Sequence, residues 1–300
     1  MTAALVDPLI DPLDNSVNER RSAASGRGRA KLVVGGSLVA ALVLVAVFAG
    51  AIAPHDPLKQ DLLHRLADPG GAHLLGTDAL GRDVFSRLVY ATRVDLRVGV
   101  LCAVVPMLVG TLVGATAGFY GGVADTLVTR LIDLVQSFPV LVFFLALLGA
   151  LGIPQAFLFL GPGELPVVIV FAAVGWIVYA RLIRGEVLRV RELDYVQAAR
   201  AAGLSRPRVL LRHVLPNAVN QTIVYVVLDV GLAILAMATL SFLGLGIPAP
   251  VPEWGAMIAE NRPYFADQWW LVVTPGLSVS VLGVGLALVG DGLDDLLKQS

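Results

Sequence analysis

Long stretches without a charged residue constrain this chain more than any other feature of its sequence. The first covers residues 32–53, and charged residues make up only 15% of the whole. A soluble domain is nearer a quarter charged, and the mean hydropathy here is +0.79. A helix of about 20 apolar residues crosses the hydrocarbon core of a bilayer, and its backbone groups are satisfied within the segment. The sequence therefore predicts an all-α polytopic membrane protein.

Six segments are expected to cross the membrane. They cover residues 32–53, part of 98–124, 125–151 with an amphipathic start and Pro139 inside, about 165–183, about 218–245, and 271–290. Pro106 is expected to kink the second span. Gly110, Gly114 and Gly118 are four residues apart, so they share a helix face that allows close packing in lipid.

Several regions are expected to lie outside these spans. Residues 1–30 are polar and predict a disordered tail. Residues 152–166 contain a Gly-Pro-Gly turn signal and predict a short loop or a re-entrant piece. Residues 54–97 form a long polar excursion between the first two spans.

Loop charge gives the expected orientation. Residues 181–213 contain eight arginines and three acids, and residues 20–31 contain five bases and no acid. An excess of Lys and Arg marks cytoplasmic loops. In contrast, residues 54–97 carry six acids and six bases, which set no preference. With six spans, both termini are predicted in the cytoplasm and residues 54–97 outside.

The basic loop has a clear local pattern. Ala, Gln, Arg and Leu favour helix up to Ala202, and Gly203 can end that helix in the left-handed region. Ser205 is a suitable N-cap for a second short helix, with Pro207 in its first turn. Pro216 then marks the next boundary.

A second motif lies in the polar excursion, at residues 75–87. Thr77 or Asp78 is expected to cap a helix, along which Arg82, Asp83 and Arg87 lie within reach of one another. Physical chemistry alone favours a solvated amphipathic helix on the membrane surface.

Both motifs resemble those of a known family. The basic loop is similar to the EAA loop of ABC-importer permeases, although a glutamine stands where the family usually has glutamate. The matching and neighbouring positions are Gln197, Ala198, Ala199, Gly203, Leu204, Arg208, Leu215 and Pro216. The outer motif resembles the second, C-type permease subunit of the dipeptide, oligopeptide and nickel importers. Its positions are Gly76, Thr77, Asp78, Gly81, Arg82 and Asp83. Residues 241–246 and 252–257 are similar to the same branch.

The resemblance implies a type I ABC-importer permease fold in a bacterial cytoplasmic membrane. It implies a coupling helix near residues 203–212 that docks on a cytoplasmic ATPase. The expected partners are a homologous second permease, two ATPase subunits, an extracytoplasmic binding protein and membrane lipid. No cofactor is expected in this chain, since ATP and Mg belong to the ATPases. The expected solutes are di- or oligopeptides, with nickel or another solute as the alternative.

The resemblance also implies a division of the chain. The predicted parts are a cytoplasmic tail at 1–31, the first span and outer segment at 32–93, and a permease domain at 94–291 that contains the coupling loop at 186–216. A second cytoplasmic tail follows at 292–300.

Other functional classes find little support. The sequence contains no phosphate-binding loop and no convincing Ser/His/Asp set, so we expect no enzyme activity. No basic aromatic patch suggests nucleic-acid binding. The single cysteine, Cys102, is expected to be buried. His55, His64 and His73 are irregularly spaced and are expected to be solvated, with no metal site.

Asp229 interrupts the fifth span and is the one clearly ionisable residue in the spans. A carboxylate facing lipid is costly, so it should face the bundle, a partner helix or a water-filled path. The helical repeat brings Met237 some 80° around from it, and both are candidates for one cavity. A hydrogen bond to a neighbouring helix is the structural alternative. A proton-coupled secondary transporter using Asp229 is a rival function, although such transporters usually show internal repeats. A membrane-embedded enzyme is a second rival.

Overall fold

The computed structural model describes residues 11–152 and 158–297, and within these residues the regular secondary structure is helical, without a β-strand. The helices are α1 (Asp11–Val47), α2 (Ala49–Ile52), α3 (Val84–Tyr120), α4 (Gly122–Gln136), α5 (Val140–Leu151), α6 (Glu164–Val190), α7 (Asp194–Ala201), α8 (Arg206–Val209), α9 (Leu215–Ala218), α10 (Asn220–Phe242), α11 (Trp254–Asn261) and α12 (Trp270–Leu297). Single turns of other helix types cover Leu62–His64, Leu210–Val214 and Arg262–Tyr264.

Five helices are long and apolar enough to cross a membrane: α1 over Gly28–Val47, α3, α6, α10 and α12. A sixth crossing follows if α4 and α5 are counted together, although they are bent by 90° at the break between them. The prediction of six spans agrees with this arrangement. The prediction that the third span runs continuously through Pro139 is wrong. Proline lacks the backbone N–H and disfavours helix at the preceding residue, so α4 ends at Gln136 and α5 begins after Pro139.

Two predicted boundaries differ from the structure. The tail expected to be disordered to residue 30 is helical from Asp11, as part of α1; residues 1–10 lie outside the described residues. The second helix starts at Val84 and not near residue 98, because Asp83 caps it there. The fourth helix extends to Val190, as expected of a span that continues into the basic loop. The loop predicted at 152–166 falls partly on residues 153–157, which are not described.

The predicted glycine face on α3 is confirmed. A Cβ atom at Gly110 would lie 2.3 Å from the carbonyl oxygen of Trp176, and one at Gly114 would lie 2.3 Å from that of Ala180. At Gly118 the nearest atom would be the Arg184 carbonyl oxygen, at 3.1 Å. Small residues therefore bring the α3 and α6 backbones into direct contact. This pair of helices makes the most extensive contact between two helices among the described residues.

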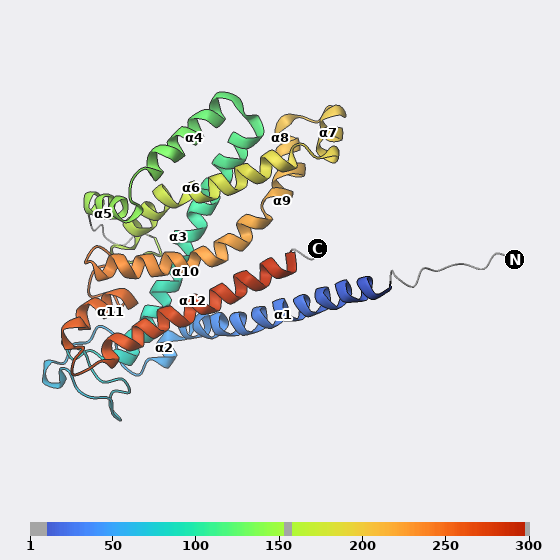
Figure 1. The fold of residues 1–300 in the computed structure, drawn as a ribbon. Coiled ribbons are helices and arrows are strands. Elements are labelled where there is room, and N and C mark those ends of the chain that lie inside the picture. The colour runs from blue at the N-terminus through green and yellow to red at the C-terminus, as the bar shows by residue number, and fades with distance from the viewer. Residues whose placement is uncertain (1–10, 153–157, 298–300) are drawn as a thin grey trace.

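The loops separate to the two ends of the bundle (Figure 1). The α7–α8 segment and the C-terminal end of α12 lie toward one end, and residues 54–83 with α11 lie at the other. Lys31 Nζ donates to Asp295 Oδ2 at 3.0 Å, which joins α1 to α12 near the first end. The boundary predicted at residue 94 falls inside α3 and does not coincide with a break in the helices.

Candidate functional site

The basic loop between α6 and α10 folds as a short helix, a glycine turn and a second short helix. Gly203 has φ of +80°, and a Cβ atom there would meet nothing within 4 Å. The left-handed backbone, rather than lack of space, is therefore what favours glycine at this position. Ser205 precedes α8 in an extended conformation, but its side chain makes no capping hydrogen bond.

One face of this loop is buried against the ends of α3 and α6. The loop contributes Val196, Val209, Leu210, Val214 and Ala218 to an apolar cluster. Its partners in that cluster are Ala115, Phe119, Ile183, Val187 and Val190, with Leu204 and Leu215 packed at the edge. Burial of this many apolar side chains holds the loop to the bundle as one unit.

Polar contacts strengthen the same attachment. Arg191 Nη1 donates to the carbonyl oxygen of Gly118 at 2.7 Å. The Arg200 guanidinium lies over the Phe119 ring, 5.2 Å from its centroid, which is within the range of a cation–π contact. The Tyr195 hydroxyl donates to the His213 carbonyl oxygen at 3.3 Å and ties α7 to the segment after α8. Displacement of the loop would thus act directly on the ends of α3 and α6.

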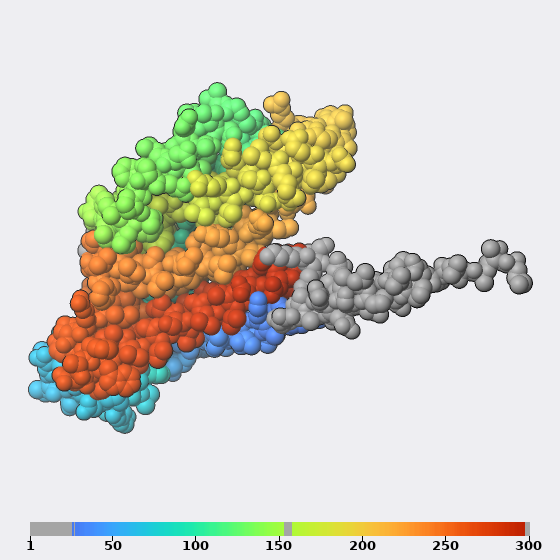
Figure 2. All heavy atoms as spheres, viewed as in Figure 1, coloured from blue at the N-terminus to red at the C-terminus, as the bar shows by residue number. Residues whose placement is uncertain are grey.

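The opposite face of the loop is exposed and positively charged. Arg206, Arg208 and Arg212 are all exposed, as are Ala198 and Pro216. Figure 2 shows this part of the chain, in yellow to orange, at the upper right of the molecule. Gln197 is also exposed, and its Nε2 donates to the carbonyl oxygen of Arg191 at 3.1 Å. The glutamine therefore makes a local hydrogen bond at the position where the family usually has a glutamate.

The boundary expected at Pro216 lies slightly elsewhere. Leu210–Val214 forms a π-helical turn, and Pro216 is within the first turn of α9. Proline is tolerated in a first helical turn, where the N–H has no helical acceptor. The chain bends again at Val219 before α10 begins. The sequence placed the interruption correctly to within about a turn.

The outer motif is buried, so the predicted surface helix is wrong. The Asp78 carboxylate accepts from Leu80 N at 2.9 Å, from Arg82 N at 3.0 Å and from Arg82 Nε at 2.6 Å. Arg82 and Arg87 both donate to Glu260 Oε2 on α11, at 2.6 and 3.0 Å. Two guanidiniums and two carboxylates thus form a buried, charge-balanced network. The sequence missed Glu260, because it lies 178 residues from Arg82.

The N-cap of the helix that begins in this motif is Asp83, and not Thr77 or Asp78. Asp83 Oδ2 accepts from Ser86 N at 2.8 Å. Burial raises the pKa of the Asp83 carboxyl, but hydrogen bonds from Ser86 and from His73 outweigh it, so the pKa lies below its usual range. Thr77 instead donates to the His64 carbonyl oxygen and accepts from Ala67 N at 2.9 Å, which closes the outer segment on itself.

Two of the histidines expected to be solvated lie against this cap. His73 Nδ1 is 2.8 Å from Asp83 Oδ1, and His55 Nδ1 is 3.6 Å from the same oxygen. His64 is exposed and pairs with Asp61 at 2.9 Å instead. Because the histidines are irregularly spaced, the sequence did not indicate that His55 and His73 both lie near Asp83.

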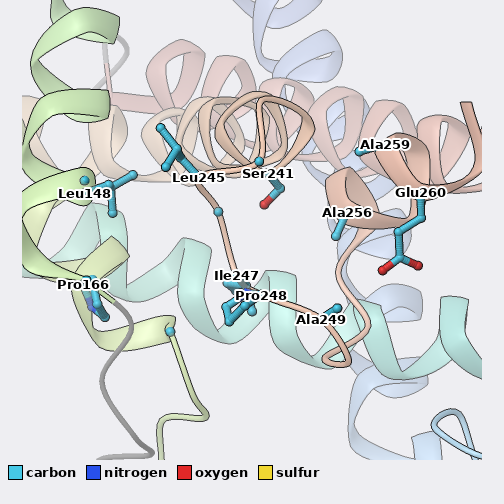
Figure 3. Close-up of a pocket in the computed structure, with 15 residues that line it drawn as sticks. Leu148, Pro166, Ser241, Leu245, Ile247, Pro248, Ala249, Ala256, Ala259 and Glu260 are labelled. Carbon is cyan, nitrogen blue, oxygen red and sulfur yellow. The ribbon is translucent and has the colours of Figure 1, made fainter.

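A cavity of about 460 Å³ opens at the end of the bundle where α11 lies (Figure 3). Leu148 of α5, Pro166 of α6 and the loop at 244–249 line it with apolar and small groups. The Ser241 hydroxyl and the Glu260 carboxylate are its polar groups on the α10 and α11 side. Its volume is typical of a small-molecule pocket.

Two further buried acids were not singled out by the sequence. Glu253 caps α11 and accepts from Gly255 N at 2.8 Å and from Ala256 N at 2.7 Å. Asp95 Oδ2 accepts from Trp254 N at 3.1 Å, which fixes the start of α11 on α3. Burial raises the pKa of the Glu253 carboxyl above its usual range, although the hydrogen bonds from Gly255 and Ala256 oppose it.

Asp229 makes a hydrogen bond between two spans. Its Oδ2 accepts from the Tyr179 hydroxyl at 2.7 Å, joining α10 to α6. The residue is half-buried, whereas Met237 is fully buried in an apolar cluster with Phe144 and Leu148. A shared cavity for Asp229 and Met237 stays a prediction. Cys102 is buried, as expected.

Comparison with known families decides what this bundle is. Residues 110–300 match the model of the binding-protein-dependent transport system inner membrane component. The chain belongs to this family. Residues 32–69 match a second model, the N-terminal transmembrane domain of oligopeptide transport permease C.

Similar proteins extend the match over most of the permease. The chain is 39% identical over 271 residues to the probable D,D-dipeptide transport system permease of Escherichia coli K12, and the match covers 90% of this chain and 88% of that protein. It is 34% identical over 300 residues to a dipeptide transport system permease of Alkalihalophilus pseudofirmus, covering 97% and 96%. It is 35% identical over 266 residues to the glutathione transport system permease of Pectobacterium atrosepticum, covering 88% and 85%. The chain is thus a multi-pass permease subunit of a binding-protein-dependent ABC importer and not an enzyme, and it works with other subunits.

Proposed function

We propose that this permease forms half of the translocation pathway of an importer for di- or oligopeptides. Named relatives that transport dipeptides, D,D-dipeptides or glutathione support this class of solute. Peptides share a backbone of amide groups and charged termini, so a permease for them needs few contacts specific to one side chain. Nickel or another solute is the alternative within the same importer class.

The observation that carries the proposal is the geometry of the α7–α9 loop. Its apolar face is fixed to α3 and α6, while its arginines face outward. A partner that moves the loop therefore moves two spans. We propose that one of two ATPase subunits binds this exposed face, with Gly203, Leu204 and Arg208 at the contact. ATP and Mg would be held by those subunits, and closure of the ATPase pair would be the change that biases the spans between two states.

The remaining partners follow from the orientation. The excess of arginines supports a cytoplasmic location for the α7–α9 loop and both termini, which would put residues 54–83 and α11 on the side of the extracytoplasmic binding protein. A homologous second permease would complete the pathway in the bacterial cytoplasmic membrane. The outer motif at 76–83, buried on α11, would keep this docking surface rigid.

Two features are the proposed solute contacts. The cavity beside Ser241 and Glu260 is open to a small polar ligand at the outer end of the bundle. Asp229 lies half-buried farther along α10 and would present its carboxyl group inside the spans. Met237 would contribute only in another conformation, because it is fully buried here.

Replacement of Gly203 tests the coupling role. Valine at this left-handed residue costs about 1–2 kcal/mol, which would mis-aim α8 without affecting insertion of the spans. Gly203→Asn is the matched control, since asparagine tolerates the left-handed region. The complex should be purified with the ATPases, and ATPase stimulation and peptide uptake should be measured together. We expect Gly203→Val to lose assembly or coupling and Gly203→Asn to retain both.

Full transport by Gly203→Val, with unchanged ATPase stimulation, would remove this loop from the mechanism. The same preparation separates the rival function. A proton-coupled transporter would purify without ATPase chains, and its uptake would follow a proton gradient in their absence.

A further inference from the structure

Three ligand atoms converge on one point of the outer segment. His73 Nδ1 and His55 Nδ1 lie 2.8 and 3.6 Å from the same oxygen, Asp83 Oδ1. One potential ligand atom from each of the three residues lies within 4.8 Å of the others. The two imidazole rings lie close together, with centroids 4.8 Å apart and ring planes tilted by 36°. Three residues that are far apart in the sequence thus present one carboxylate and two imidazoles to a common centre.

The Asp83 side chain and the backbones of His55 and His73 are held in place by hydrogen bonds outside the centre. Asp83 Oδ2 is occupied by Ser86 N at 2.8 Å, which leaves Oδ1 directed at the histidines. The backbone N–H of His55 donates to Ser86 Oγ at 3.1 Å, so the same serine positions a second ligand. The His73 carbonyl oxygen accepts from Gly70 N at 2.8 Å and from Gly76 N at 3.0 Å. A hydrogen bond to the second oxygen of a ligating carboxylate, as at Asp83, helps to orient a metal ligand.

A small cavity gives access to the centre. Its volume is about 300 Å³, and His55, His73 and Asp83 line it together with Asp61 and His64. The Asp83 side chain is 1% exposed, whereas His73 is 23% and His55 41% exposed. One ligand is therefore buried, and the other two border an open side where water or a fourth ligand can enter.

We propose that His55, His73 and Asp83 form a binding site for a divalent transition-metal ion of the zinc type. Ligands 2.0–2.2 Å from a tetrahedral zinc ion lie about 3.4 Å from one another, and the distances of 2.8 and 3.6 Å from the two imidazoles to Asp83 Oδ1 bracket that separation. Imidazole nitrogens favour zinc, copper or nickel, whereas magnesium and calcium require oxygen ligands. Three protein ligands leave a fourth position for water.

The metal would act as a clamp on the outer segment. His55 follows α2, His73 lies in the middle of residues 54–83, and Asp83 begins α3. An ion bound by all three would fix this segment on the end of α3, independently of the proposed solute. The metal is thus a ligand of the outer surface and not a cargo of the pathway.

Metal content of the purified full-length permease tests the site. The protein in detergent should be equilibrated with zinc chloride, desalted and analysed by mass spectrometry for metal. We expect the wild type to retain about one zinc ion per chain that His55→Gln and His73→Gln lose. His64→Gln is the matched control, because His64 borders the same cavity but pairs with Asp61. Magnesium chloride in excess should not displace the zinc.

The thermal midpoint gives an independent readout. Zinc should raise the midpoint of the wild type and of His64→Gln, since a ligand that binds the folded state stabilises it. Zinc should leave the thermal midpoint of His55→Gln unchanged. The His55 side chain is exposed, so its replacement should not prevent folding. Equal zinc retention by all four proteins, or equal loss in His64→Gln, would overturn the proposal.

Discussion

Arg82 and Glu260 join two parts of the permease that are 178 residues apart, with Nη2 of the arginine 2.6 Å from Oε2 of the glutamate. Arg87 donates to the same oxygen, and the Asp78 carboxylate accepts from Arg82 Nε. The outer motif is therefore a buried connection between the start of α3 and α11. This connection bears on the mechanism because α11 also borders the cavity beside Ser241 and Glu260.

This network predicts a large effect of Glu260→Ala on stability. Loss of one partner from a buried ion pair costs about 3–5 kcal/mol, because the other charge stays buried. Since Glu260 is 28% exposed, we expect a loss near the lower end of that range. Glu186→Ala is the control, because Arg189, its partner, is 64% exposed and such pairs contribute at most about 1 kcal/mol. The midpoint of thermal unfolding in detergent measures both, and equal shifts would contradict the prediction.

The contact between α3 and α6 predicts a second effect. A Cβ atom at Gly114 would lie 2.3 Å from the Ala180 carbonyl oxygen, so even alanine forces the two backbones apart. Overpacking of this kind costs about 1–3 kcal/mol. Gly276→Ala in α12 is the control, since a Cβ atom there meets nothing within 4 Å. Gly114→Ala should lower the thermal midpoint at normal membrane abundance, and Gly276→Ala should not. An unshifted midpoint for Gly114→Ala would argue against this packing.

The sequence predicted those features whose causes are local. The spacing of Gly110, Gly114 and Gly118 identified the packed face of α3, and Gly203 was identified as the end of a helix. Both depend on the backbone geometry of a few neighbouring residues.

The outer motif was misread because its partners are distant. Asp78 is a residue type that favours the N-cap position. Its carboxylate instead accepts from Arg82, and Arg82 also donates to Glu260 of α11. His55 and His73 show the same limit, since only the fold brings them to Asp83. Periodicity also could not show that α4 and α5 meet at 90° around Pro139, because α4 is amphipathic and α5 is apolar on all sides, and neither pattern fixes the angle between them.

Orientation can be tested by labelling single cysteines in a Cys102→Ala background. Ser205 and Asp68 are both exposed, so a cysteine at either site is accessible from its own side of the membrane. Loop charge predicts that an impermeant thiol reagent labels Asp68→Cys in intact cells. Ser205→Cys should react only after the membrane is opened. Labelling of Ser205→Cys in intact cells would place the α7–α9 loop outside and exclude a contact with cytoplasmic ATPases.

Asp229 allows its charge and its hydrogen bond to be separated. Asp229→Asn removes the charge, but its amide oxygen can still accept from the Tyr179 hydroxyl. Tyr179→Phe removes the hydrogen bond and leaves the charge. If the carboxylate attracts solutes in the pathway by about 1 kcal/mol, Asp229→Asn should reduce uptake of a cationic dipeptide roughly five-fold more than that of a neutral one.

Tyr179→Phe should lower the thermal midpoint and affect the two peptides equally. Uptake should be measured in proteoliposomes that contain the complete importer at equal abundance. Equal loss for both peptides in Asp229→Asn would assign the residue a structural role between α6 and α10. In that case Asp229→Asn and Tyr179→Phe should differ in stability alone, because only the second leaves the carboxylate without its donor.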